Sequence, residues 1–246
     1  MKYIAHRGAS HYAPENTLVS FALAESMGLF SHELDVHLSK DGELVVHHDF
    51  DLSRTALKPV KIAETNFADL RKYNVAAHFS RKYPPQNVPT LREVFEILGS
   101  RSKLNVEVKN EGGIYKGIEK KTLDCAGKHF KNWRARLSIS SFDHETLERA
   151  RKLSPEVRIG VLAGKVDMDE VISTALKLKA ESVNISGLQA SAALVKKIHA
   201  AGLKVLVYTI NERKHAVALE KMGVDGVFTN RPDLGQENWA NIGGSD

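Results

Sequence analysis

Short apolar runs rich in β-branched residues alternate with amphipathic segments along most of the chain. In the amphipathic segments, such as residues 194–198, apolar side chains recur at three- and four-residue spacing, which indicates helices with one buried face. Gly28, Gly202 and Gly223 each follow such a segment and precede an apolar run, as a glycine that ends a helix does. The apolar runs predict eight strands: Lys2–Ala5, His32–Val36, Lys103–Val108, Leu137–Ser141, Arg158–Leu162, Ser182–Ile185, Leu203–Thr209 and Gly226–Phe228.

Eight successive strand–helix units in 246 residues predict an α/β fold of the (β/α)8, or TIM barrel, type. Such barrels usually contain roughly 250 residues. A doubly wound open sheet would use the same alternation, but the chain has no glycine-rich dinucleotide fingerprint, which favours the barrel. We expect residues 1–246 to form a single barrel domain.

Residues 37–102, between the second and third predicted strands, do not follow this repeat. Asp41–Asp49 has the pattern of a short β-hairpin arm, whereas Phe50–Pro89 is irregular and rich in proline. Long segments without a regular pattern are usually functional when they interrupt a compact domain. We therefore expect a small insertion subdomain of approximately residues 49–90, between strands 2 and 3, folded over the barrel mouth.

The composition is that of a folded protein, with 42% hydrophobic and 26% charged residues. No apolar run approaches the roughly 18 residues that a membrane span requires. The N-terminal segment reaches His6 and Arg7 too early for a signal-peptide core, and the single Cys125 cannot form an internal disulfide. We therefore expect a cytoplasmic protein with no membrane span. A formal net charge of +5 does not distinguish anionic ligands from an ordinary lysine-rich surface.

Charged side chains stand on or just after three of the predicted strands. The carboxyl ends of barrel strands converge on one face, which carries the active site in known barrels. Two of these strands carry charges two residues apart, which places each pair on one side of its strand. The residues are His6 and Arg7, then Glu33 and Asp35, then Glu107 and Lys109.

Three of these residues, Glu33, Asp35 and Glu107, are carboxylates in strands that should be almost wholly apolar. Burying an unpaired charge is costly, so another group must offset them. Oxygen-only donors suit a divalent cation such as Mg²⁺, Ca²⁺ or Mn²⁺. The alternative is structural pairing with Arg7 and Lys109. Because three carboxylates outnumber two cations, the sequence favours the metal.

Two histidines, His6 and His48, also stand at predicted mouth positions. A histidine titrates near neutral pH and can either accept or donate a proton. Arg7 and Lys109 are suited to binding phosphate oxygens. A cation site, a basic clamp and an acid–base pair together predict cleavage of a phosphodiester.

Further motifs follow in a fixed order along the chain. The full set is His6-Arg7-Gly8, Pro14–Thr17, Glu33–Val36, Asp41-Gly42, His48-Asp49, Val88–Leu91, Glu107–Lys109, Ser140–Phe142, Tyr208–Asn211 and Thr229–Pro232. This set resembles the glycerophosphodiester phosphodiesterase family, and the resemblance runs from Ile4 to about Pro232.

The resemblance implies metal-dependent hydrolysis of glycerophosphodiesters to sn-glycerol 3-phosphate and an alcohol, within lipid and glycerol metabolism. It implies a divalent cation, Mg²⁺, Ca²⁺ or Mn²⁺, on Glu33, Asp35 and Glu107. It also implies His6 and His48 as the acid–base pair, and resemblance to phosphoinositide-cleaving barrels favours His6 as base and His48 as acid.

In the same resemblance Arg7 and Lys109 hold the phosphate and Tyr208 lies in the substrate pocket. The family commonly has Trp at the position of Tyr208 and Asp at the position of Asn230. Asn16 is expected to serve the start of the first helix, as a cap, rather than the site.

Two other functions would use the same barrel. A lysophospholipase-type phosphodiesterase would be favoured by an exposed apolar patch at the mouth, formed by Phe50, Phe67, Tyr73 and Phe79. A non-catalytic phosphate-ligand binder would be expected if the histidine or carboxylate set were broken, and it is intact. Lys116–Arg136 is basic, but we expect a solvated outer helix rather than a nucleic-acid surface. The expected partner is a small-molecule substrate, and either a monomer or a homodimer is compatible with the sequence.

Overall fold

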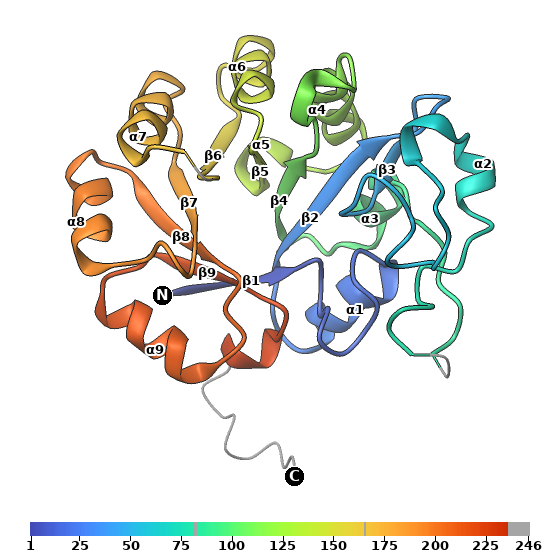
Figure 1. The fold of residues 1–246 in the computed structure, drawn as a ribbon, viewed down its shortest axis with the longest axis horizontal. Helices are drawn as coiled ribbons and strands as arrows, with labels where there is room; N and C mark the ends of the chain where they lie inside the picture. The colour runs from blue at the N-terminus through green and yellow to red at the C-terminus, as the bar shows by residue number, and fades with distance from the viewer. Residues whose placement is uncertain (81–82, 165, 236–246) are drawn as a thin grey trace, which may run out of the picture.

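The computed structural model describes residues 1–80, 83–164 and 166–235. Their strands form a closed parallel barrel ringed by helices (Figure 1). Each barrel strand pairs in parallel with the next, and β1 pairs with both β9 and β2, which closes the sheet. The strands are β1 (Lys2–His6), β2 (Ser31–Leu38), β4 (Lys103–Val108), β5 (Leu137–Ser141), β6 (Arg158–Leu162), β7 (Ser182–Ser186), β8 (Lys204–Tyr208) and β9 (Gly226–Thr229). The predicted (β/α)8 barrel is confirmed, and the open doubly wound sheet is excluded.

Five of the described helices begin at a polar residue whose side chain accepts a hydrogen bond from the first turn. Thr17 and Thr90 each accept a hydrogen bond from the backbone three residues later, and each forms a reciprocal capping box. The helices are α1 (Leu18–Ser26), α2 (Phe67–Leu70), α3 (Leu91–Ile97), α4 (Ile118–His129), α5 (Trp133–Arg136), α6 (His144–Leu153), α7 (Met168–Lys177), α8 (Ala192–Ala200) and α9 (Arg213–Lys221). The five helices with such a cap are α1, α3, α6, α7 and α8. Short 3-10 turns are η1 (Ile62–Glu64), η2 (Glu111–Gly113) and η3 (Pro232–Gly235).

The barrel wall is apolar on its outer side and partly polar on its inner side. Val106, Ile139 and Val183 are fully buried in the layer between strands and helices. On β4, β5 and β7 the alternate positions include the small polar residues Asn105, Ser138, Ser140 and Ser182, whereas Leu206 and Phe228 keep the interior apolar on β8 and β9. Inside, the Ser138 hydroxyl donates to Asn105 Oδ1 at 3.0 Å, and Asn105 Nδ2 donates to Ser140 Oγ at 2.8 Å. A cavity of about 160 Å³ lies at each end of this interior, and Asn105 lines both.

The chain between β2 and α3 leaves the barrel wall. β3 (Leu44–Val46) pairs antiparallel with β2, which confirms the predicted hairpin. The following segment, which includes η1 and α2, lies to one side of the barrel beside β2 and β3 (Figure 1). It has an apolar cluster of its own, formed by Val45, Leu52, Ala56, Ile62, Leu70, Val75 and Val88.

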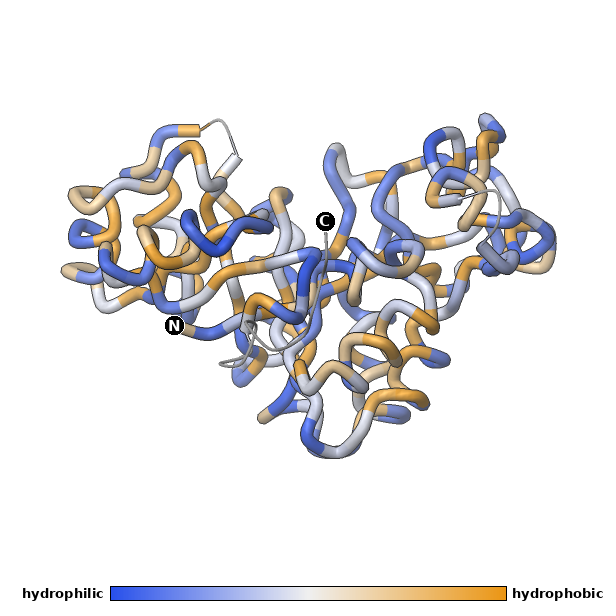
Figure 2. The backbone as a smooth tube through the Cα atoms, turned by 90° about the horizontal axis from the view of Figure 1, so that it is seen from below, coloured by the Kyte–Doolittle hydropathy of each residue, from blue (hydrophilic) through white to orange (hydrophobic). Residues whose placement is uncertain are grey.

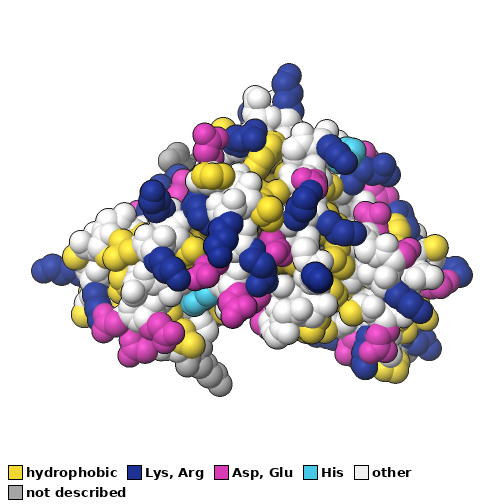
Figure 3. Space-filling view, turned by 90° about the horizontal axis from the view of Figure 1, so that it is seen from above, with side chains coloured by type: hydrophobic (Ala, Val, Ile, Leu, Met, Phe, Trp, Pro, Cys, Tyr) yellow, Lys and Arg dark blue, Asp and Glu magenta, His cyan; other side chains and the backbone are white. Residues whose placement is uncertain are grey.

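Hydrophobic and hydrophilic residues alternate along the backbone (Figure 2), and no helix in the described ranges is long and apolar enough to cross a membrane. The basic segment Lys116–Arg136 forms α4 and α5, with Phe130 and Trp133 buried in the core. On α4, Lys120 pairs with Asp124 at 2.6 Å. On the face shown in Figure 3, basic and acidic side chains are intermixed, which is typical of a solvated surface.

Candidate active site

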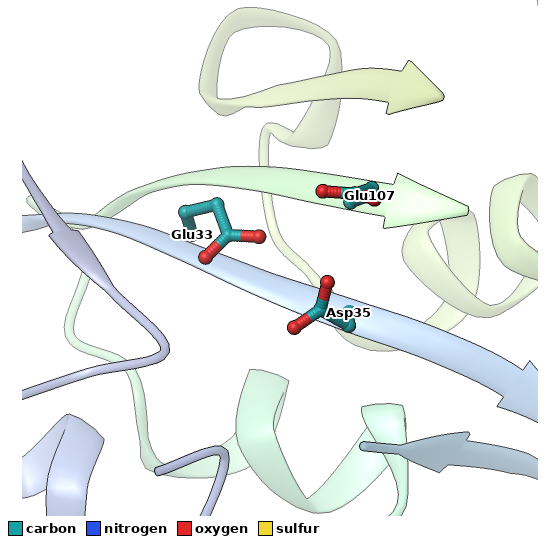
Figure 4. Close-up of side chains that lie close together, drawn as sticks. All are labelled: Glu33, Asp35 and Glu107. Carbon is teal, nitrogen blue, oxygen red and sulfur yellow. The ribbon is translucent and has the colours of Figure 1, made fainter. Parts of the chain in front are cut away.

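Three carboxylates from two neighbouring strands meet inside the barrel (Figure 4). Asp35 on β2 is paired in register with Glu107 on β4, and Glu33 lies two residues earlier on the same side of β2. One oxygen of each side chain lies within 4.8 Å of the other two, and all three side chains are buried. The two-residue alternation of a strand therefore creates this acidic cluster.

Two cations balance part of this charge. Lys109 Nζ lies 3.0 Å from Asp35 Oδ1 and also donates a hydrogen bond to Glu107. Arg7 Nε lies 3.4 Å from Asp35 Oδ2, while Arg7 Nη1 donates to Glu15 at 2.9 Å. Burial disfavours the charge on Lys109, but Asp35 and Glu107 outweigh it and raise its pKa. Asp35 and Glu107 are thus paired with basic side chains, which is the alternative to a metal that the sequence left open.

Glu33 is not neutralised in this way. Its Oε2 accepts a hydrogen bond from the backbone N–H of Arg7 at 3.1 Å. Its Oε1 is buried without a hydrogen-bond partner among the described residues. Burial, Asp35 and Glu107 raise the pKa of Glu33 well above its ordinary value. A buried oxygen without a partner beside two further carboxylates fits a hard divalent cation, whose preferred ligands are oxygens.

The turn after β1 places His6 and Arg7 beside this cluster. Arg7 and Gly8 adopt positive φ angles of 57° and 78°. A Cβ on Gly8 would lie 2.4 Å from Ser20 Oγ and 2.6 Å from its carbonyl carbon, so only glycine fits here. The turn brings His6 Nε2 to 3.9 Å from Glu33 Oε2.

His6 is held as a neutral imidazole. Its Nδ1 lies 2.7 Å from Asn230 Oδ1, and the backbone N–H of Asn230 donates to Asn211 at 2.8 Å. Because an amide oxygen only accepts, Nδ1 carries the proton and Nε2 keeps its lone pair. Burial and then the charge of Arg7 lower the pKa of His6 to about 3. At neutral pH this ring is therefore uncharged, and its Nε2 lone pair is not used by a proton.

His48 has a different partner. Its Nδ1 lies 2.7 Å from the carboxylate of Asp49, whose other oxygen accepts from Arg54 Nε at 2.7 Å. Burial acts to raise the pKa of Asp49, but hydrogen bonds from His48 and Arg54 outweigh it and lower that pKa. Asp49 is therefore ionised. The two histidines thus have different partners, an uncharged amide for His6 and a carboxylate for His48.

A link between Glu15 and Arg54 joins the inserted segment to the barrel. Arg54 donates to both oxygens of Glu15, at 2.8 and 2.7 Å, and Glu15 also accepts from Arg7. Burial would raise the pKa of Glu15, but Arg54 and Arg7 lower it to about 2. Sequence reasoning did not identify Glu15, Asp49 or Arg54 as partners, although the Pro14–Thr17 and His48-Asp49 motifs contain two of them.

The expectation that Asn16 serves the helix start is wrong. Thr17 is the N-cap of α1, and Asn16 Nδ2 instead donates to Asp35 Oδ2 at 2.8 Å. Asn16 has φ of 55°, a left-handed conformation that asparagine tolerates better than most residues. This conformation turns the amide towards the barrel interior, where it holds a carboxylate of the acidic cluster.

All the site residues predicted from the sequence except Asp35 line one cavity of about 160 Å³ at the carboxyl ends of the strands. Its lining includes His6, Arg7, Glu33, His48, Glu107, Lys109 and Tyr208. Asp35 is buried against Glu107 and does not reach the cavity wall. The Tyr208 hydroxyl donates to the Ala163 carbonyl at 3.1 Å, and burial, with Glu107, raises its pKa to about 12.

The four aromatic residues considered for an apolar patch do not line this cavity. Phe67 and Tyr73 pack against the apolar cluster of the inserted segment, and Phe79 stacks edge-on with Tyr83. Phe50, which is 40% exposed, packs against the ring of His37. These four rings therefore pack within or beside the inserted segment and are not part of the cavity wall.

A barrel that gathers carboxylates, two basic side chains and two histidines around one cavity has the features of a phosphodiester hydrolase. The sequence model of the "Glycerophosphoryl diester phosphodiesterase family" matches residues 6–234. The chain belongs to this family.

Individual relatives agree with this assignment. A glycerophosphodiester phosphodiesterase of Caldanaerobacter subterraneus is 34% identical over 231 residues, which cover 94% of each chain. A solved phosphodiesterase of Oleispira antarctica, in complex with the product sn-glycerol-3-phosphate, is 33% identical with a TM-score of 0.85 over 94% of each chain. The glycerophosphodiester phosphodiesterase of Thermotoga maritima is 26% identical, with a TM-score of 0.76 over 94% of this chain and 95% of that one.

Proposed function

We propose that the protein hydrolyses glycerophosphodiesters to sn-glycerol 3-phosphate and an alcohol, with a divalent cation as cofactor. The observation that carries this proposal is the convergence of the acidic cluster, Arg7, Lys109 and the two histidines on one cavity. Family membership and the product complex of the Oleispira antarctica phosphodiesterase support the substrate class. We place this activity in one barrel domain, residues 1–246, with an insertion of approximately residues 49–90. The cytoplasmic location stays a prediction.

Glu33, Asp35 and Glu107 would hold the cation, which supplies charge neutralisation at the phosphoryl oxygens. Arg7 and Lys109 line the same cavity and would bind the remaining phosphate oxygens. Both side chains are already held by carboxylates, so they need little reorganisation when the substrate enters. Tyr208 closes one wall and would contact the glycerol or the leaving alcohol.

His6 and His48 would divide the proton transfers. The free Nε2 of neutral His6 would accept the proton of the attacking oxygen nucleophile. His48, paired with ionised Asp49, would donate a proton to the departing alkoxide, which is a poor leaving group when unprotonated. The Asn230 amide fixes His6 in the tautomer that this role requires.

The direct test is a panel of glycerophosphodiesters with different alcohols, assayed with Mg²⁺, Ca²⁺ or Mn²⁺ after chelator treatment. Glycerol 3-phosphate release should be detected with at least one diester and one ion. A matched lysophospholipid should be a poorer substrate, because Phe50, Phe67, Tyr73 and Phe79 do not line the cavity; comparable turnover would favour the lysophospholipase alternative. Tight binding of the diester without turnover under every ion would instead identify a non-catalytic binder.

A further inference from the structure

The second cavity lies at the opposite, N-terminal end of the barrel. It has a volume of about 160 Å³, and the first residues of six strands line it. Two of these residues are serines and four are cationic, Lys2, Lys103, Arg158 and Lys204; Arg136 of α5 adds a fifth positive charge. We refer to this space as the N-terminal cavity.

Only two carboxylates among the described residues line this cavity, and both already have partners. The two oxygens of Glu181 accept from Arg158 Nε and Nη2 at 2.8 and 2.7 Å. Asp225 Oδ2 accepts from the backbone N–H of Val205 at 2.8 Å and lies 2.9 Å from His199 Nε2. They offset Arg158 and little of the remaining positive charge.

The other four cations form no direct ion pair with a carboxylate of the described residues, although Glu181 attracts Lys2 and Lys204, and Glu25 attracts Arg136, from a greater distance. In the described parts of the chain, Lys2, Lys103 and Lys204 lie within 4.0 Å of no carboxylate oxygen. Arg136 donates to the backbone carbonyls of Ser102 and Lys131, at 2.7 and 2.8 Å, which orients its guanidinium without cancelling its charge. Lysines on a convex face repel one another little in water, but positive groups around one concavity reinforce each other's field.

Gly160 lines the N-terminal cavity, and a Cβ at this position would lie 2.9 Å from Asn184 Nδ2 and 3.0 Å from Ser182 Oγ. Asn184 is 1% exposed and lies behind this wall without lining the cavity, and its Nδ2 has no hydrogen-bond partner among the described residues. The groups that face the cavity and indicate its ligand are therefore the cationic side chains.

We propose that the N-terminal cavity binds a small tetrahedral oxyanion of the phosphate class, at a site distinct from the active site. A doubly charged ion with only acceptor oxygens matches the excess of cationic donors, five against two carboxylates, around this cavity. The cavity volume corresponds to roughly five water molecules, enough for one such ion. Asn105 separates this ion from the active-site cavity, because its amide bonds to Ser138 on one side and Ser140 on the other.

The test is calorimetric titration of the full chain with inorganic phosphate, at constant ionic strength and with chelator present. Lys103→Gln with Lys204→Gln should weaken binding about tenfold for each lysine removed. The matched control is Lys120→Gln with Lys177→Gln, two lysines on outer helices, and it should bind as the unmodified chain does. Diesterase activity at saturating metal should stay unchanged in both double variants.

A second variant separates this site from phosphate binding at the active site. Arg7→Gln with Lys109→Gln should abolish any titration at the active-site cavity and leave the N-terminal site intact. The proposal is overturned if the Lys103→Gln, Lys204→Gln variant titrates like the unmodified chain while the Arg7→Gln, Lys109→Gln variant loses all binding. The phosphate titrations require no turnover. A failure of the proposed hydrolysis would therefore not affect the binding constants that decide this proposal.

Discussion

The two ends of the barrel carry opposite excesses of charge. At the C-terminal end, three buried carboxylates face Arg7 and Lys109, and Arg7 is shared with Glu15. At the N-terminal end, five cations face two carboxylates that already have partners. Both cavities open from the barrel interior. A barrel filled with closely packed apolar side chains would leave no room for either cavity.

This difference shows at which strand positions a barrel can place charged side chains that have no partner of opposite charge. Residues at strand starts keep long side chains partly in water, so Lys2, Lys103 and Lys204 are exposed. Glu33 and Asp35 lie deeper in the strand, where desolvation is severe. The proposed cation would therefore stabilise the charged form of a fully buried cluster at the C-terminal end, whereas the proposed anion at the N-terminal end would not be required for folding.

Withholding the cation should cause the largest effect at the C-terminal end. Activity on a glycerophosphodiester should fall by roughly 10³-fold or more in excess chelator, because several kcal/mol of charge stabilisation are lost. Adding Mg²⁺, Ca²⁺ or Mn²⁺ back should restore it. Full activity in excess chelator would refute the metal site.

Glu33→Gln should separate metal binding from folding. Since burial already favours the protonated form of Glu33, glutamine should leave the metal-free melting temperature nearly unchanged. The increase in melting temperature on adding the metal should be lost, because binding to the native state alone stabilises it. Glu170→Gln, at an exposed position on α7, is the control and should retain that increase.

The two histidines should give the next largest effect, and they should not respond alike. His6→Ala and His48→Ala should each lose about 10²–10⁴-fold in kcat/KM on a glycerophosphodiester. A nitrophenyl diester has a leaving group that needs no proton, so only His48→Ala should recover on it. Recovery of His6→Ala instead would reverse the assignment of base and acid, and near-normal rates on the natural diester in either variant would exclude the pair.

The barrel and the acidic cluster could be predicted from sequence because both depend on local periodicity. Strand alternation places Glu33 and Asp35 on one side, and parallel pairing with β4 then brings in Glu107. The match of β4 and β5 to the predicted ranges Lys103–Val108 and Leu137–Ser141 has the same origin. A strand's inner and outer faces are fixed by spacing alone.

The partners of the histidines and the N-terminal cavity could not be predicted in this way. Asn16 reaches Asp35 only because its backbone is left-handed, and Arg54 reaches Glu15 across 39 positions of an irregular segment. Lysines at strand starts look like solvated charges until the closed barrel brings them around one concavity. These contacts depend on how turns direct the chain, which hydropathy patterns do not encode.

The Glu15–Arg54 link should make stability at the C-terminal end depend on acid. The folded pKa of Glu15 is about 2, below its ordinary value of 4.5. The link therefore contributes fully above about pH 4.5 and is lost as pH falls towards 2, an effect of up to about 3 kcal/mol. Urea unfolding between pH 7 and pH 2.5 should show that Glu15→Gln is less stable at pH 7 and converges with the unmodified chain in acid. Glu64→Gln, an exposed carboxylate paired with Lys61, should run parallel to the unmodified chain; parallel curves for Glu15→Gln would show that the link contributes nothing.

The smallest expected effect is a change in the phosphate affinity of the N-terminal cavity. Glu181→Gln removes the carboxylate that holds Arg158, so the N-terminal cavity gains a free positive charge. Phosphate affinity in the calorimetric titration should rise by about three- to tenfold, because a unit charge several ångströms away in a partly wet cavity contributes about 1 kcal/mol. The free energy of unfolding without phosphate should fall by no more than about 1 kcal/mol, since the Arg158–Glu181 pair is partly exposed. Glu148→Gln, which frees Lys177 on an outer helix, should change stability similarly without altering phosphate affinity. Unchanged or weaker phosphate binding in Glu181→Gln would mean that the charge of this cavity does not attract the anion.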